Sequence, residues 1–202
     1  MSEPILQGDP PARARHDWAG PVTGRPVPVA LVTVAVLAVL GWRIGLRPDL
    51  PAFGYLGAVG VPLTFIDVAL KRLPDPLTLP SYVAGAALLG LAAPFTDQGG
   101  TRYVHALIGM AVLWLLYAVQ WVIVPSQIGL GDVKLSGVLG LYLGWLGLQA
   151  WIVGVLGMFL LAGFYSVVLL ASGKATRKSS IPFGPFMLAG TLVAVLLFAQ
   201  PA

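Results

Sequence analysis

The chain lacks cysteine altogether and contains only two histidines, His16 and His105. The lack of cysteine excludes disulfide bonds, thiolate zinc sites and enzymes with a cysteine nucleophile. Two histidines far apart in the sequence argue against a histidine-rich metal site and against a serine–histidine triad. No metal and no cofactor is therefore predicted.

Charged residues are also scarce. They make up 10% of the 202 residues, whereas 57% of the residues are hydrophobic and the mean hydropathy is +0.87. Because soluble domains carry about 25% charged residues, this composition predicts an integral membrane protein. The net charge of +4 does not indicate nucleic-acid binding, because the basic residues flank apolar segments, as topology signals do.

Apolar runs fill most of the chain beyond residue 26. Most of them approach the ~20 residues that a membrane-spanning helix needs, and they lie at 27–46, 53–71, 80–96, 103–124, 133–148, 150–172 and 184–200. The sequence therefore predicts an all-α, polytopic helix bundle with about seven transmembrane helices. Residues 1–26 are rich in proline, glycine and arginine, which predicts a disordered cytosolic tail before a membrane domain at 27–202.

Lysine and arginine are distributed unevenly between the two sides of the predicted bundle. One set of connections contains nine of them, namely Arg13, Arg15, Arg25, Lys71, Arg72, Lys134, Lys174, Arg177 and Lys178. The opposite set contains Arg43, Arg47 and Arg102. Because basic connections stay in the cytosol, the N-terminus is expected to be cytosolic and the C-terminus to lie outside.

Two aspartates interrupt apolar runs where membrane proteins usually avoid charge. Asp67 lies in the second run and Asp132 lies at the head of the fifth, both near the predicted cytosolic face. Taken singly, Asp132 fits a helix N-cap and Asp67 fits a partner for an interfacial arginine. Because an ionisable group at membrane depth is functional by default, the shared face favours a catalytic pair. Two carboxylates that share one proton can activate a water molecule and protonate a carbonyl oxygen.

Two proline-containing segments flank the predicted pair. Pro74, Pro76 and Pro80 are expected to stop the second helix and to keep the following connection extended. Asp75 is then either a solvated turn residue or a helper at the mouth of the site. The segment 181–186 is expected to be either a plain helix-start loop or one wall of a substrate cleft; its candidate site residues are Pro182, Gly184 and Pro185.

A glycine turn precedes Asp132. Gly129 and Gly131 allow the backbone to turn sharply and to approach a neighbouring helix or a substrate strand. Lys134 is two residues from Asp132, so on a helix it is expected to point elsewhere. It is interpreted mainly as an interface anchor and, less so, as a group that binds substrate charge.

Together these motifs resemble the prepilin peptidase (type IV leader peptidase) family of intramembrane aspartic proteases. The matching stretches lie in order within residues 53–190 and are Asp67 with Leu73–Leu79, Gly129–Leu135 and Pro182–Pro185. The resemblance implies that Asp67 and Asp132 are the catalytic pair. It also implies that the enzyme removes short basic leaders from type IV pilin-like or pseudopilin-like precursors, after a glycine just before their apolar helix. The implied location is the cytosolic face of a bacterial plasma membrane.

The chain departs from this family in more than one respect, and one departure is Ile128, which stands where longer glycine runs are common. Many bacterial members have a cytosolic insert with paired Cys-x-x-Cys motifs and also N-methylate the new N-terminus with S-adenosylmethionine. This chain has no cysteine, and its first connection is short and predicted to lie outside. A peptidase-only form is therefore expected.

Three alternatives to an active leader peptidase stay open, and one of them is a degenerate family member that helps assembly without cleaving. A presenilin-like protease also uses Gly-x-Gly-Asp, but there the partner motifs are Tyr-Asp and Pro-Ala-Leu, whereas Asp67 follows Ile66 here. A small transporter or assembly scaffold would bind protons or cations at the aspartates. Repeated halves or aspartates at mid-membrane would favour that alternative.

Overall fold

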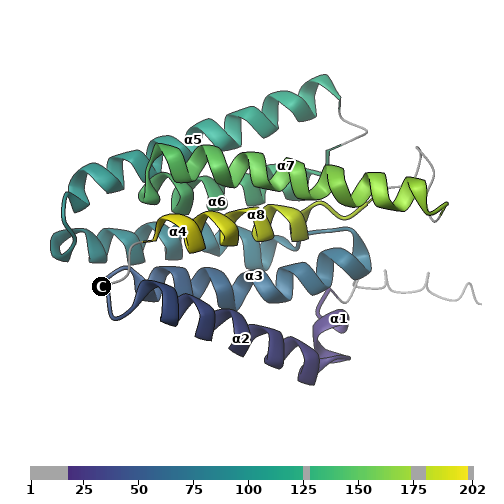
Figure 1. The fold of residues 1–202 in the computed structure, drawn as a ribbon, viewed down its shortest axis with the longest axis horizontal. Helices are drawn as coiled ribbons and strands as arrows, with labels where there is room; N and C mark the ends of the chain where they lie inside the picture. The colour runs from purple at the N-terminus through teal and green to yellow at the C-terminus, as the bar shows by residue number, and fades with distance from the viewer. Residues whose placement is uncertain (1–17, 125–127, 174–180, 200–202) are drawn as a thin grey trace, which may run out of the picture.

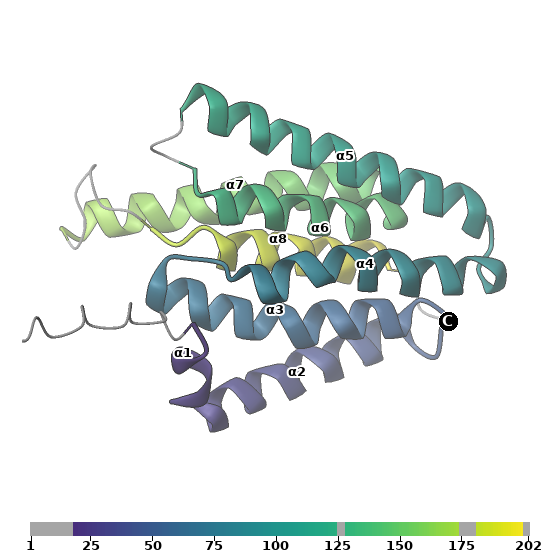
Figure 2. The ribbon, with the colours of Figure 1, turned by 180° about the vertical axis from the view of Figure 1, so that it is seen from behind.

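Helices form all the regular structure in the computed structural model, which describes residues 18–124, 128–173 and 181–199. In these ranges, the long helices α2 to α8 alternate in direction and lie side by side (Figures 1 and 2). The elements are α1 (Gly20–Thr23), α2 (Pro26–Ile44), α3 (Leu50–Leu70), α4 (Asp75–Ala92), the 3-10 turn η1 (Ala93–Phe95), α5 (Gly99–Ile123), α6 (Leu130–Leu146), α7 (Leu148–Ala171) and α8 (Gly184–Phe198). Each predicted apolar run corresponds to one long helix.

Five of the helices are long and apolar enough to cross a membrane, namely α2, α3, α4 with η1, α5 and α7. The helices α6 and α8 are shorter, with 17 and 15 residues. Most of α6 is buried, because the other helices surround it. The prediction of an all-helical, multi-pass membrane protein is confirmed. A membrane-crossing role for the two shorter helices stays a prediction.

The connection after α3 differs from the prediction. Pro74 is extended, with a ψ of 131°, but Pro76 and Pro80 do not hold the connection extended, because α4 begins at Asp75 and continues through both of them. Proline is tolerated in the first turn of a helix, where no N–H partner is needed and its fixed φ suits the helix. The second predicted helix does end before the prolines, at Leu70, and Pro74 is extended, but the prediction is wrong for Pro76 and Pro80, which lie within α4. Asp75 accordingly lies in the first turn of α4.

Only part of the predicted tail falls within the described structure. Residues 1–17 lie outside the described residues, so the predicted disorder of that segment stays a prediction. The later residues 18–26 include α1 and the first residue of α2.

The helices α5 and α6 pack with their backbones in contact. A Cβ atom added at Gly109 would lie 2.6 Å from the carbonyl oxygen of Gly140, and one added at Gly140 would overlap the carbonyl oxygen of Gly109. One turn away, a Cβ at Gly144 would overlap the carbonyl oxygen of His105. Small residues at such crossings allow close van der Waals packing, which is the main attraction between helices in lipid.

Polar contacts fasten the end of the bundle where α2 and α8 finish. The Arg43 side chain donates from Nε to the carbonyl oxygen of Leu196, at 2.6 Å, and so satisfies the C-terminal end of α8. The buried Asp49 carboxylate accepts from Arg47, at 2.9 Å, and from the indole of Trp145, at 3.0 Å. These contacts give the buried charge of Asp49 a structural explanation.

Substituting Gly140 by alanine tests the backbone contact. We expect Gly140→Ala to lower the free energy of unfolding by about 1–3 kcal/mol, because the new methyl group overlaps α5. Gly163→Ala is the control, because a Cβ at Gly163 has no atom within 4 Å. Thermal unfolding in detergent would measure both. Equal melting temperatures for the two variants would contradict the packing described.

Candidate functional site

Asp67 lies in the last turn of α3 and its side chain is buried. The helix ends directly afterwards at Lys71, whose φ of 50° is left-handed and whose N–H donates to the carbonyl oxygen of Asp67, at 2.8 Å. The Asp67 carboxylate accepts from the backbone N–H of Gly184, at 2.9 Å. Because Gly184 is the first residue of α8, the carboxylate satisfies an N–H that has no partner within its own helix.

Asp132 lies in the first turn of α6 and is half-buried. Its backbone N–H donates to the carbonyl oxygen of Gly129, at 3.0 Å. The Asp132 carboxylate also lies close to Gly129: a Cβ atom added at Gly129 would lie 3.2 Å from Asp132 Oδ2. The glycine turn therefore sets both the backbone and the side-chain position of Asp132.

Asp67 and Asp132 line one cavity of about 260 Å³ at the same end of the bundle. The lining combines three carboxylates with three basic side chains, and it consists of Asp67, Asp75 and Asp132, of Lys71, Arg72 and Lys134, and of Leu73, Gly129, Leu130 and Gly131. The structure thus brings the two predicted aspartates together, while their catalytic role stays a prediction.

Leu73 joins the three motifs around the cavity, and the sequence analysis did not select it. A Cβ atom at Gly131 would lie 2.9 Å from Leu73 Cβ, and one at Gly184 would lie 3.4 Å from Leu73 Cδ2. The side chain is buried. In the sequence, Leu73 is a single apolar residue between the basic pair at the end of α3 and Pro74, at the start of the matching stretch Leu73–Leu79.

Lys134 and Asp75 form an ion pair at the rim of the cavity, with 2.7 Å between Nζ and Oδ1. Lys134 and Asp132 are both among the residues that line the cavity, and the Lys134 ammonium is bonded to Asp75 rather than to Asp132. A lysine side chain is long and flexible enough to extend its charged head along the protein surface. The predicted position of Asp75 near the mouth agrees with its partly exposed side chain.

The segment before α8 supplies a hydrogen bond to the site and does not line the cavity. Gly184 lies against Asp67, and a Cβ atom there would lie 2.8 Å from Asp67 Oδ2. Pro182 is half-buried ahead of α8. Of the three residues expected to shape the site, Gly184 contacts the Asp67 carboxylate directly, whereas Pro182 and Pro185 are not among the residues that line the aspartate cavity. A substrate cleft wall at this segment stays a prediction.

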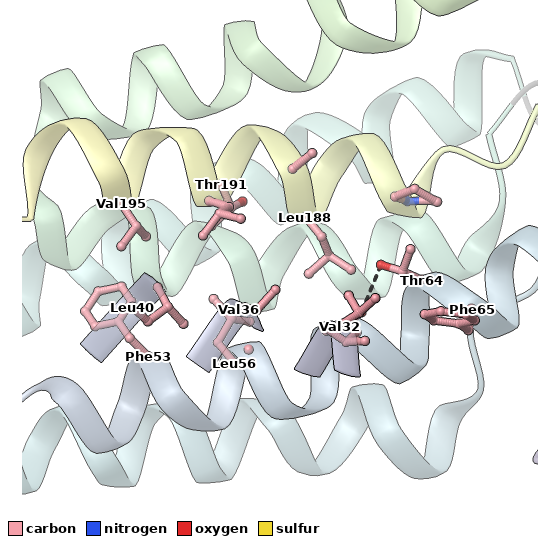
Figure 3. A pocket seen from close by; sticks show the side chains of 16 residues that line it. Val32, Val36, Leu40, Phe53, Leu56, Thr64, Phe65, Leu188, Thr191 and Val195 are labelled. Carbon is pink, nitrogen blue, oxygen red and sulfur yellow. Dashed lines mark hydrogen bonds between the residues drawn. The ribbon is translucent and has the colours of Figure 1, made fainter. Parts of the chain in front are cut away.

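Pro185 instead lines a separate groove of about 300 Å³ between α2, α3 and α8. Figure 3 shows Val36, Leu40 and Leu188 directed into this groove. The hydroxyl of Thr64 donates to the carbonyl oxygen of Gly60, at 2.9 Å, as the dashed line marks. No ionisable side chain lines the groove, so it offers no acid–base chemistry of its own.

In the part of the chain that the structure describes, no three histidine, aspartate or glutamate side chains gather closely enough to hold a metal ion. The ionisable side chains that line the cavity among the described residues are carboxylates and basic groups. Such a site is suited to acid–base catalysis with a water nucleophile.

Comparison with known proteins identifies similar sequences. The prepilin leader peptidase/N-methyltransferase of Aeromonas hydrophila is 35% identical over 173 residues, which cover 83% of this chain and 55% of that protein. Proteins with the same name from Aeromonas salmonicida (strain A449) and Burkholderia pseudomallei (strain 1026b) are 35% and 34% identical. The matches cover 72% and 75% of this chain, and 50% and 47% of those proteins. The chain thus spans about half the length of the curated relatives that it matches.

No solved structure matches the chain. The model of the type IV leader peptidase family matches residues 54–172, which are more than half of the chain. This stretch contains Asp67, Asp75 and Asp132 and the glycine turn before Asp132. The chain belongs to the type IV leader peptidase family.

Proposed function

We propose that this protein is an intramembrane aspartic endopeptidase that removes the short basic leader of type IV pilin-like precursors. The observation that carries the proposal is the shared cavity of Asp67 and Asp132, in a chain of this family. The relatives named above are prepilin leader peptidases/N-methyltransferases, which supports the substrate class. The proposed activity here is hydrolysis of the leader peptide bond alone.

The proposed reaction needs one water molecule and one proton shared by the two aspartates. Like charges at short range repel, so a single proton between the carboxylates relieves the repulsion. The ionised carboxylate removes a proton from water, which attacks the scissile carbonyl carbon, while the protonated carboxyl donates to the carbonyl oxygen. When the tetrahedral intermediate collapses, the carboxyl that took the proton from water gives it to the leaving amine, and a hydroxyl of the intermediate returns a proton to the other carboxylate, so the shared proton is restored. No covalent intermediate and no cofactor is required.

The site is proposed to face the cytosol of a bacterial plasma membrane. The described basic residues Lys71, Arg72 and Lys134 line the cavity, and the positive-inside rule places such a cluster in the cytosol. The precursor is then presented with its leader in the cytosol and its apolar helix in the bilayer. Lys174, Arg177 and Lys178, which also support this orientation, lie outside the described residues.

The position of the aspartates argues against a transporter or scaffold that binds cations at mid-membrane. Asp67 is in the last turn of α3 and Asp132 in the first turn of α6, so both lie at one end of the bundle. A peptidase that cuts at the junction of a polar leader and an apolar helix needs its catalytic groups at the end of the bundle, where Asp67 and Asp132 lie.

Replacing either aspartate by asparagine tests the catalytic pair. We expect Asp67→Asn and Asp132→Asn each to reduce leader cleavage by at least ~10²-fold, because the general acid or base is lost. Cleavage would be followed by co-expression with a pilin-like precursor and by the mobility shift of the processed product. Asp97→Asn, at an exposed turn before α5, is the control. Equal processing by all the proteins would refute the mechanism.

Gly184→Ala tests the hydrogen bond that holds Asp67. The added methyl group would lie 2.8 Å from Asp67 Oδ2 and would displace the carboxylate. Because a small misplacement of a catalytic group has a large effect on rate, kcat should fall by up to ~10²-fold while the protein stays folded. Gly163→Ala, which meets no neighbour, should cleave at the wild-type rate. A Gly184→Ala enzyme with wild-type kcat would show that the contact is dispensable.

The rim ion pair should influence binding of the basic leader more than catalysis. Lys134→Gln removes the ion-pair partner of Asp75, so the Asp75 carboxylate becomes available to the basic leader and KM should fall. Asp75→Asn removes that carboxylate, so KM should rise. Each change should amount to no more than roughly fivefold, since exposed ion pairs are weak. Steady-state kinetics with a basic-leader peptide at two salt concentrations would measure this. Parallel changes of KM in both variants would contradict a role in leader binding.

A further inference from the structure

One tyrosine hydroxyl near the aspartates is buried without a partner. Tyr117 of α5 is 2% exposed, and its hydroxyl has no hydrogen-bond partner among the described residues. A buried donor without a partner costs free energy, so native structures contain few of them. Phenylalanine would fill the same space without that cost. The hydroxyl therefore calls for a functional explanation.

The register of α5 against α6 places Tyr117 opposite Asp132. The antiparallel helices touch at His105 with Gly144, at Gly109 with Gly140, and at Leu113 with Ser136, whose hydroxyl lies 3.4 Å from the carbonyl oxygen of Leu113. Each pair is one step of four residues along both helices, close to one helical turn. The next step brings position 117 of α5 beside position 132 of α6.

Two aromatic rings fix the orientation of Tyr117. The ring of Phe159 from α7 stacks on it with centroids 6.1 Å apart, and the ring of Phe183 lies at 6.3 Å. Phe183 directly precedes Gly184, whose N–H binds Asp67. Tyr117 therefore packs against the segment that holds one aspartate, and its helix runs beside the helix that carries the other.

Tyr117 is not among the residues that line the aspartate cavity. We propose that Tyr117 is a positioning residue of the peptidase, whose hydroxyl donates a hydrogen bond to the Asp132 carboxylate during the reaction, directly or through one water molecule. Hydrogen bonds at catalytic groups are often long in the free enzyme and tighten when substrate binds. This inference rests on the proposed function of Asp132.

Tyr117→Phe tests the proposal, because it removes the hydroxyl and keeps the ring. The variant should be at least as stable as the wild type, since a buried unpartnered donor is removed. Its kcat should nevertheless fall by about tenfold or more with little change in KM, because Asp132 is held less well while substrate binding is untouched. The substrate would be a peptide with a basic leader, a glycine and an apolar helix, and the enzyme the full chain in detergent micelles.

Tyr142→Phe is the matched control. The hydroxyl of Tyr142 is also buried without a partner among the described residues, and its ring packs on Phe53 with centroids 5.4 Å apart. It lies about ten residues, or roughly 15 Å, further along α6 than Asp132. Tyr142→Phe should therefore keep its melting temperature or raise it, and should cleave with wild-type kcat.

The outcomes separate this inference from the proposed function. A stable Tyr117→Phe enzyme with reduced kcat, beside a fully active Tyr142→Phe enzyme, supports the positioning role. Wild-type kcat in Tyr117→Phe, or an equal loss in both variants, overturns it. A change in KM alone also overturns it, because Tyr117 would then act on substrate binding. Asp132→Asn tests the proposed function separately: if that variant is inactive and Tyr117→Phe is normal, only the positioning role fails.

Discussion

The backbone contact between α5 and α6 is the constraint on which the site end of the bundle depends. Because Gly109 and Gly140 bring the two helices together at their backbones, the register of the pair has little freedom. That register sets the position of the first turn of α6 relative to α5, and this turn contains Asp132. It also fixes which residues of α5 lie beside Asp132. A packing requirement in the middle of the bundle thus determines the position of a carboxylate at its end.

The second carboxylate is positioned differently. Asp67 is fixed by the start of α8, whose first N–H it accepts, and by the left-handed end of α3 at Lys71. The buried Asp49 at the opposite end shows the contrast, because it is neutralised by Arg47 and bonded by Trp145. Asp49 serves the fold, whereas Asp67 and Asp132 share a cavity with each other. Burial alone therefore does not distinguish a functional acid from a structural one in this protein.

Much of this arrangement could be predicted from the sequence, and the failures have physical causes. The lengths of the apolar runs predict the long helices, and counting spans places Asp67 and Asp132 at one end of the bundle. The prediction of an extended connection fails at Pro76, because Pro76 falls in the first turn of α4, where proline is compatible with a helix. Leu73 and Tyr117 could not be selected, because their importance arises from contacts between helices. Tyr117 looks like an ordinary core residue within its apolar run, and Leu73 is a single leucine between two apolar runs.

The central claim is that Asp67 and Asp132 act as one unit on one water molecule, and a double-mutant comparison tests it most directly. The cleavage rates of Asp67→Asn, Asp132→Asn and the double variant would be measured by mass spectrometry on the same leader peptide. Residues that act as a unit are not additive. The account predicts that the double variant is no slower than the slower single variant. Losses that multiply in the double variant would show that the two carboxylates act independently and would contradict the account.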